Sequence, residues 1–233
     1  MLQYQTVSPG TVTLIRQLMS MPEVDPFLLV GGTSLSLQLG HRISVDLDFF
    51  TDKSFDVDSL RVALSTTIPS FEILRMSKTG FTCNAQGIKC DFFNWAVPFI
   101  EQPITEDGLR LCSLKDIAAF KLDAISTRKE KKDYRDIDAL LNYFTLAELV
   151  SFHQKKFSYM SIKVVLDALS EIDLADNSEE PTILVPRDWN EIKQRIKESW
   201  LHYINEKLNR KEKEKTERLK KAEELLKNKK NKQ

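Results

Sequence analysis

Two aspartates alternate within a short apolar segment, and this pattern limits the fold more than any other feature of the chain. Asp46 and Asp48 lie in the segment VDLDFF, residues 45–50, which is typical of a strand in a buried sheet. Side chains alternate between the two faces of a strand, so both carboxylates should point the same way, about 6–7 Å apart. Two such carboxylates repel each other, and a divalent cation relieves the repulsion. Hard oxygen ligands favour Mg²⁺, which usually binds one or two carboxylates together with substrate phosphates.

A glycine turn precedes the two aspartates. Gly31 and Gly32 follow the apolar segment PFLLV and lead into a predicted helix over residues 33–39. Glycine lets the backbone approach a ligand closely, and the free N–H groups at the start of a helix attract phosphate oxygens. The hydroxyls of Thr33 and Ser34 can add hydrogen bonds. Alone, such a turn is usually plain turn geometry, but the paired aspartates that follow favour a phosphate-binding site.

Further polar residues accompany these two motifs. In a predicted strand over residues 42–50, Arg42 and Ser44 alternate with the aspartates, so all four side chains should share one face. The guanidinium of Arg42 matches phosphate oxygens, although it could instead neutralise the neighbouring aspartates. Asp91 is the one acid in another apolar strand, IKCDFFNW, where an unpaired charge would be costly. Three strand carboxylates could bind two metal ions, one at the attacking hydroxyl and one at a triphosphate.

Two consecutive predicted helices carry a cation and an anion at their inner edges. The helix from Ser113 to about Thr127 has Lys121 within its apolar face. A lysine there either extends to the surface or reaches into a site. In the next helix, Asp133 extends the apolar stripe by one turn and Asp136 lies near the same face. The pair suggests an oriented site, although Asp133 could instead cap its helix.

The order of the predicted elements indicates an α+β fold. The chain begins with a helix over residues 9–19, the first two strands and a helix over 58–65. Three strand candidates follow, with turns at Gly80 and Gly87. Helical patterns then dominate from 113 to about 208. We predict a mixed-sheet core at 1–112, a helical C-terminal domain at 113–204 that completes the site, and a Lys/Glu-rich tail at 205–233 that forms a frayed helix.

The charge of the chain is unevenly distributed. The sequence has 34 Lys/Arg and 34 Asp/Glu, but residues 205–233 hold 12 of the basic and 6 of the acidic residues, which leaves 22 and 28 for the remainder. A basic tail on an acidic body is typical of proteins that contact nucleic acid. The tail is therefore expected to add salt-dependent affinity for nucleic acid phosphates.

Other features favour a cytoplasmic protein with no membrane partner. The three cysteines form neither a CxxC motif nor a Cys/His metal spacing, so reduced and packed thiols are expected. The first residues lack the basic segment and apolar run of a signal peptide. No stretch approaches the ~18–20 apolar residues of a membrane span.

These motifs together resemble the AbiEii/AbiGii-type nucleotidyltransferases, toxins of bacterial toxin–antitoxin and phage-defence systems in the DNA polymerase beta-like superfamily. The matching segments are LVGGTSLSLQLGHRISVDLDFF, IKCDFFNW and SLKDIAAFKLDAISTRKEKKDYRDIDALL, which span roughly residues 27–144. The resemblance implies a polymerase beta-like core of mixed sheet and flanking helices, followed by a helical part. It also implies an NTP substrate (GTP, CTP or another), Mg²⁺, an acceptor that is the 3′ end of tRNA in some members, and an antitoxin encoded nearby.

The resemblance also assigns roles to individual residues. It implies Asp46 and Asp48 as metal ligands with Asp91 as the third carboxylate, Lys121 as the essential helix lysine and Asp133 as the later essential aspartate. Arg135 and Asp136 complete the last motif, although Arg135 stands where an apolar residue is expected. The predicted nucleotide-binding residues are Gly31, Gly32, Thr33, Ser34, Arg42, Ser44 and Lys121.

The sequence therefore predicts a Mg²⁺-dependent nucleotidyltransferase. A hydroxyl, at an RNA 3′ end, attacks the α-phosphate of an NTP and releases pyrophosphate, a reaction that depends on positioning and charge neutralisation. The predicted catalytic residues are Asp46, Asp48, Lys121 and Asp133. Two alternatives stay open: an enzyme that nucleotidylates a protein hydroxyl, and a catalytically decayed NTP-binding module.

Overall fold

One mixed sheet of seven strands forms the centre of the molecule. The computed structural model describes residues 1–230, with side chains described through residue 221. The strands are β1 (Leu28–Val30), β2 (Leu47–Thr51), β3 (Phe71–Ser77), β4 (Gly80–Ala85), β5 (Ile88–Asn94), β6 (Ile104–Glu106) and β7 (Leu109–Leu111). Their order across the sheet is β3-β4-β5-β2-β1-β7-β6. Because β2 pairs antiparallel with β1 but parallel with β5, the centre of the sheet contains both kinds of ladder.

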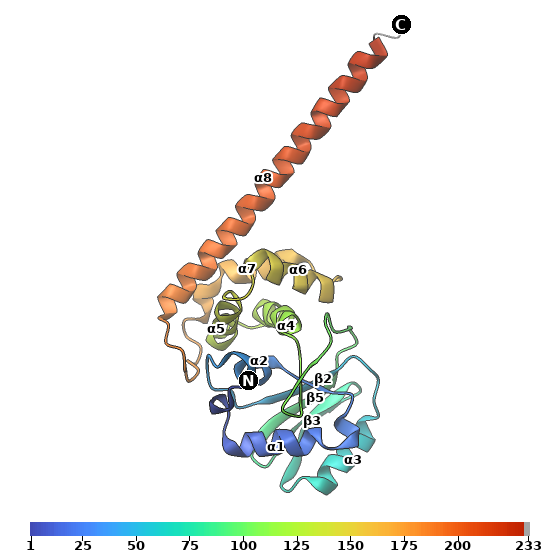
Figure 1. Cartoon of the computed structure of the whole chain (residues 1–233), viewed down its shortest axis with the longest axis vertical. Coiled ribbons are helices and arrows are strands. Elements are labelled where there is room, and N and C mark those ends of the chain that lie inside the picture. The colour runs from blue at the N-terminus through green and yellow to red at the C-terminus, as the bar shows by residue number, and fades with distance from the viewer. Residues whose placement is uncertain (231–233) are drawn as a thin grey trace.

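Helices surround this sheet and then form a separate helical layer. They are α1 (Pro9–Met19), α2 (Gly31–Leu39), α3 (Val57–Thr67), α4 (Leu114–Thr127), α5 (Lys131–Leu140), α6 (Leu146–Lys156), α7 (Ile162–Ser170) and α8 (Trp189–Lys230). Helices α1 and α3 lie on one side of the sheet, and α2, α4 and α5 lie on the other, with α6 and α7 beyond them (Figure 1). The architecture confirms the predicted α+β class. The proposed division into three regions stays a prediction.

Most of the predicted elements form close to their expected bounds. The helix α1 begins after Ser8, whose hydroxyl accepts a hydrogen bond from the Thr11 amide, as expected for an N-cap. Ser113 caps α4 in the same way. The sequence reasoning missed the short strands β6 and β7, which form a three-residue hairpin pair at the sheet edge. Residues 231–233 of the predicted tail lie outside the described residues.

The predicted strand over residues 42–50 is wrong in its first half. Strand β2 begins only at Leu47, and Val45, expected within an apolar strand, is 67% exposed. The backbone of the preceding segment pairs elsewhere, because the Ile43 amide donates to the Thr182 carbonyl and the Ser44 amide to the Thr6 carbonyl. These partners come from distant parts of the chain, so no strand ladder forms there.

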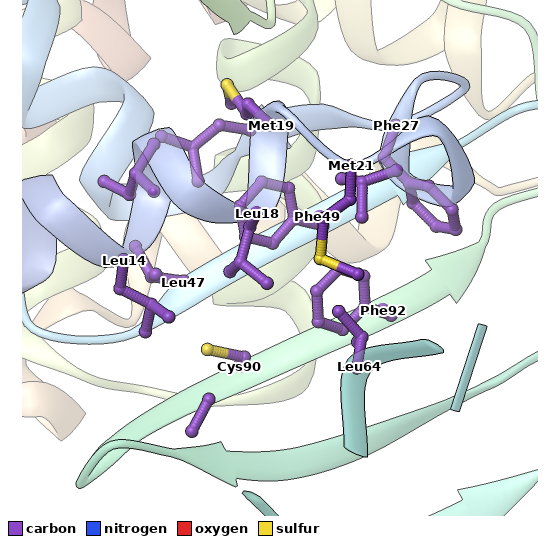
Figure 2. Packing of buried hydrophobic residues seen from close by; sticks show 14 of the residues in the cluster. Leu14, Leu18, Met19, Met21, Phe27, Leu47, Phe49, Leu64, Cys90 and Phe92 are labelled. Carbon is purple, nitrogen blue, oxygen red and sulfur yellow. The ribbon is translucent and has the colours of Figure 1, made fainter. Parts of the chain in front are cut away.

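Two hydrophobic clusters cover the two faces of the sheet. On the side of α1 and α3, Phe49 stacks on Phe92 with ring centroids 4.9 Å apart, and leucine side chains of α1 pack around this pair (Figure 2). On the opposite side, Val30 and Leu35 join the apolar residues of α4 to α8. Successive residues of a strand face opposite sides of the sheet. Asp48 precedes Phe49 and Asp91 precedes Phe92, so both aspartates face α4.

Helix α8 packs on the body only through its first turns. Ile192, Ile196 and Tyr203 are buried against α5, α6 and α7, whereas every described residue from Asn205 onward is exposed. The rest of the helix extends away from the molecule (Figure 1). Among residues 1–230, no helix combines the length and apolar character needed to cross a membrane. The three cysteines are free and buried, as expected.

Candidate active site

Strands β2 and β5 place two aspartates side by side in the middle of the sheet. In the parallel ladder Asp48 is the direct partner of Asp91, so their Cα atoms are about 4.8 Å apart. Leu47, Phe49 and Phe92 belong to the core beneath α1, and therefore Asp48 and Asp91 face the opposite side, toward α2 and α4. This is the face on which the first helical turn of α2 begins.

Asp48 lacks a partner of opposite charge. Within the part of the chain that the structure describes, no hydrogen bond or ion pair reaches the carboxylate of Asp46 or Asp48. Burial, followed by the neighbouring charge of Asp91, raises the pKa of Asp48 to about 6, although Lys121 and Lys89 act in the opposite direction. Asp91 itself is held by the hydroxyl of Thr82 and by the Lys89 ammonium, whose Nζ lies 3.0 Å from Oδ2. The site therefore has excess negative charge at Asp48.

The glycine turn lies directly against this carboxylate. Gly31 has φ +65°, and a Cβ added to it would overlap the side chain of Asp48. A Cβ on Gly32 would meet the guanidinium of Arg42, with the Ser44 hydroxyl 3.2 Å away. Although residues 42–46 do not form a strand, the turn still brings Arg42, Ser44 and Asp48 around the start of α2. Both glycines are required here because no side chain fits between the two segments.

The two hydroxyls after the glycines are fully buried. Thr33 Oγ1 donates to the backbone carbonyl of Asp46 and lies 2.9 Å from Ser44 Oγ. The Ser34 hydroxyl accepts a hydrogen bond from Gln38 at 3.2 Å. Thr33 thus fixes the segment that carries the aspartates against α2. The predicted nucleotide contacts of Thr33 and Ser34 stay predictions.

Replacing Gly31 is expected to disable this arrangement. The variant Gly31→Ala should lose about 1–2 kcal/mol of stability from the positive φ and should displace the Asp48 carboxylate, eliminating the nucleotide transfer that the sequence predicts. Gly87→Ala is the matched control, because Gly87 has φ +84° but no atom within 4 Å of an added Cβ. Thermal unfolding and nucleotide-transfer assays on both variants test this. Equal transfer by the two variants would contradict a role for the Gly31–Asp48 contact.

A buried network of charges joins α4 and α5 beside the aspartates. Lys121 Nζ lies 2.9 Å from Asp133 Oδ1 and 2.5 Å from Asp136 Oδ2, and only 5% of Lys121 is exposed. The ammonium therefore reaches into the site rather than to the surface. Burial opposes its charge, but the two carboxylates outweigh burial and raise the pKa of Lys121. Asp133 bonds to side chains, and the N-cap position of α5 belongs to Glu130, so helix capping is not its role.

Asp136 connects this network to the segment after α2. Its carboxylate accepts two hydrogen bonds from Arg42, at 2.6 Å and 2.8 Å, and lies 2.7 Å from His41 Nε2. Burial alone would raise its pKa, yet Arg42 and Lys121 hold the pKa of Asp136 well below its usual range. The Arg42 guanidinium therefore pairs with an aspartate of α5 and not with Asp46 or Asp48, which the sequence offered as the alternative to a phosphate contact.

The structure adds three residues that the sequence reasoning did not assign to the site. Arg128 donates from Nε to Asp133 Oδ2 at 2.8 Å, Lys89 pairs with Asp91, and His41 bonds to Asp136. Arg128 could have been predicted from the basic residues that follow α4, because a cation at the end of one helix can reach a carboxylate on the next helix. His41 has no ligand spacing in the sequence, and only the fold reveals its partner.

The carboxylate pair fits a divalent cation. Burial and the charge of Asp91 raise the pKa of Asp48. Its carboxylate lies next to the backbone of Gly31, which has no side chain to block a ligand. In the described part of the chain, no three His, Cys, Asp or Glu side chains converge as a complete metal site. Mg²⁺ commonly uses one or two carboxylates and takes its remaining ligands from substrate phosphates and water, so an incomplete protein ligand set suits it.

The mixed sheet with a glycine turn, strand aspartates and a helical layer has the fold of nucleotidyltransferases. A crystal structure of a protein from H. pylori proposed to be a nucleotidyltransferase has a TM-score of 0.57, with 18% identity, and the match covers 86% of this chain and 93% of that one. MenT4, a nucleotidyltransferase toxin from Mycobacterium tuberculosis, has a TM-score of 0.51 with 14% identity, covering 82% and 80%. These likenesses establish the fold.

The chain belongs to the AbiEii nucleotidyltransferase toxin family. The family model described as the nucleotidyl transferase AbiEii toxin of type IV toxin–antitoxin systems matches residues 13–77, which include the glycine turn and Asp48. The uncharacterized protein aq_aa25 of Aquifex aeolicus is 30% identical over 196 residues, covering 82% of this chain and 94% of that protein. The predicted resemblance is thereby confirmed, and the chain is a nucleotidyltransferase of a toxin–antitoxin family.

Proposed function

We propose that this protein transfers a nucleotide from an NTP, with GTP or CTP favoured, to the 3′ hydroxyl of an RNA, most plausibly a tRNA, in a reaction that depends on Mg²⁺. The observation that carries the proposal is the partnerless Asp48 carboxylate, which lies between Gly31 and Asp91 and has a raised pKa. A carboxylate in this state favours binding of a cation. Lys121 lies nearby but its ammonium pairs with Asp133 and Asp136, so the negative charge of Asp48 is not neutralised by an ion pair with it.

The residues divide into two sets with different tasks. Asp46 and Asp48, with Asp91 beside them, would hold Mg²⁺, which when bound neutralises the triphosphate and activates the attacking hydroxyl. The backbone amides at the start of α2 would receive phosphate oxygens. Lys121 adds positive charge near the triphosphate, and its ammonium is fixed by Asp133 and Asp136.

The chemical step needs positioning more than a strong base. The acceptor oxygen forms a bond to the α-phosphorus, the bond between that phosphorus and the β-phosphate oxygen breaks, and pyrophosphate leaves while the hydroxyl proton passes to water. The charge that develops on the phosphate oxygens is stabilised by fixed groups that need not reorganise during the reaction. Arg42, bonded twice to Asp136, keeps the segment before β2 in place.

Labelling of RNA tests the proposal directly. Purified protein is incubated with each α-labelled NTP, Mg²⁺ and total bacterial RNA, and label is expected in a tRNA-sized band. Asp48→Ala should abolish the labelling, whereas Asp52→Ala, which removes an exposed carboxylate four residues further on, should retain it. Label on protein would replace RNA with a protein acceptor, and NTP binding with no label on either would indicate a decayed module.

An antitoxin partner follows from the family. Type IV toxin–antitoxin membership implies that a neighbouring gene product counteracts the toxin. The intact Asp46, Asp48, Lys121 and Asp133 argue against a decayed site, since loss of function commonly removes metal ligands first. Co-expression with the neighbouring gene should restore growth of cells that express the intact protein and should change nothing for Asp48→Ala.

A further inference from the structure

Helix α8 changes character at the point where it leaves the body. Its inward face carries an apolar stripe at helical spacing, formed by Trp189, Ile192, Ile196, Trp200 and Tyr203. The helix continues without a break beyond this stripe, and from Asn205 onward every described side chain is exposed as the helix extends away from the body (Figure 1). The same helical face therefore continues into solvent.

The continuation of this face is strongly basic. We define the cationic stripe as the residues of 207–221 that share one arc of the helix, about 140° wide at about 100° per residue, which are Lys207, Arg210, Lys211, Glu214, Lys215, Arg218 and Lys221, with Glu217 at the border of the arc. It has six basic residues and one acidic residue, for a net charge of +5. The remaining residues of the same segment, 208–220, have two basic and two acidic residues, for a net charge of zero. The excess positive charge thus lies on one face.

Most basic groups of the cationic stripe have no acidic partner among the described side chains and can bind an anion. All seven residues are exposed, and within the stripe Arg210 pairs with Glu214 at 3.2 Å. Among the residues with described side chains, no acidic group pairs with the ammonium of Lys207, Lys211 or Lys215. Exposed helical lysines often pair with a glutamate one turn away, so their unpaired state here leaves the charge available.

We propose that the cationic stripe binds the phosphate backbone of the RNA acceptor. This inference rests on the proposed function for its choice of RNA. From Lys207 to Lys221 the stripe extends about 21 Å along a straight helix, a length suited to a series of backbone phosphates. Protein interfaces rely on apolar or aromatic anchors at their centre, whereas the stripe has only two exposed leucines at its border, Leu208 and Leu219, about 16 Å apart along the helix. Repeated cations without a central apolar anchor favour a nucleic acid backbone over an acidic protein.

Two matched double variants of the full chain test the face rather than the charge. Lys211→Glu with Arg218→Glu changes the stripe, and Lys213→Glu with Lys220→Glu changes the opposite face. Both pairs are exposed, lie seven residues apart and alter the net charge by the same amount. Lys and Glu have similar helix propensities, so circular dichroism should show equal helix content. Binding of fluorescein-labelled total tRNA is measured by anisotropy without NTP, from 50 to 200 mM KCl.

The stripe variant should bind tRNA about tenfold or more weakly at 100 mM KCl, and the slope of log K against log salt should fall by about 1.5, since each phosphate contact contributes about 0.7–0.9. The opposite-face variant should lose less than about threefold. Equal losses of tRNA affinity in both variants, or no loss in either, would overturn the proposal. It would also be overturned if the intact protein bound an acidic protein more tightly than RNA through the stripe. Absence of NTP from this assay separates RNA binding from nucleotide transfer, which the labelling assay reports.

Discussion

Asp48→Asn is expected to abolish nucleotide transfer and yet to raise the thermal stability of the protein at pH 7.5. The Asp48 carboxylate is half-buried beside Asp91, and the loss of solvent together with the neighbouring charge raises its pKa from 3.8 to about 6. At pH 7.5 the ionised carboxylate therefore destabilises the fold. An asparagine of the same shape removes the charge, for a gain of about 1–3 kcal/mol, or about 3–10 °C in Tm for a chain of this size.

The sign of the pH dependence follows from the raised pKa. A carboxyl group whose pKa is higher in the folded than in the unfolded state stabilises the fold below its unfolded pKa, and this stabilisation is lost as the pH rises through its folded pKa. The intact protein should therefore approach the stability of Asp48→Asn as the pH falls from 7.5 to 4. The window from about pH 4 to pH 6 should contain most of the change.

Calorimetry with and without Mg²⁺ measures both effects. Mg²⁺ should raise the Tm of the intact protein and leave that of Asp48→Asn nearly unchanged, because binding to the folded state alone is stabilising. Transfer of label should fall at least about a hundredfold in the variant. Asp52→Asn serves as the control and should leave both properties intact. A lower Tm at pH 7.5 in Asp48→Asn would show that Asp48 supports the fold and would contradict this account.

Asp136→Asn is expected to have the opposite effect on stability and to lower it by about 3–5 kcal/mol. The carboxylate of Asp136 is fully buried and neutralises Arg42 and Lys121 while bonding to His41. An asparagine keeps the shape but leaves two buried cations with less negative charge. Since the total stability of a domain is about 5–15 kcal/mol, a loss of this size is large.

Asp138→Asn provides a matched control two residues away. Asp138 pairs with Arg187 and Arg195, whose side chains are 36% and 31% exposed, so water can replace the lost contact and the cost should be about 1 kcal/mol. Urea titration of both variants measures the difference. Because the pKa of Asp136 is lowered, its contribution is present above pH 4 and is lost as the pH falls further. Equal losses in the two variants would refute the special role of the buried network.

The sequence reasoning succeeded where the signal is local. The glycine turn and the caps at Ser8 and Ser113 depend on neighbouring residues, and each forms at the expected position, whereas β2 begins at Leu47 and leaves Asp46 outside the predicted strand. Strands β6 and β7 were missed because three-residue segments have too short a pattern to detect. The first half of the predicted strand 42–50 failed because its backbone partners, Thr6 and Thr182, cannot be read from the local pattern.

The site was only partly predictable for the same reason. Lys121 and Asp133 were placed correctly on inner helical faces by their periodicity. The pairing of Arg42 with Asp136 joins residues 94 positions apart, and no local pattern contains it. The burial that raises the pKa of Asp48 likewise depends on the covering helices. Residue types were thus readable in advance, whereas their partners and their charge states required the fold.

The separation of Arg42 and Asp136 along the chain also affects when the protein can become active during its synthesis. Translation at about 5–20 residues per second separates the two residues by about 5–20 s, and further residues must leave the ribosome tunnel before α5 can dock. Until then the Arg42 segment and Lys121 lack the carboxylate that neutralises them both. A nascent chain that already contains the glycine turn and the aspartates therefore still lacks the charge network beside them, and the site can be completed only after α5 has left the ribosome.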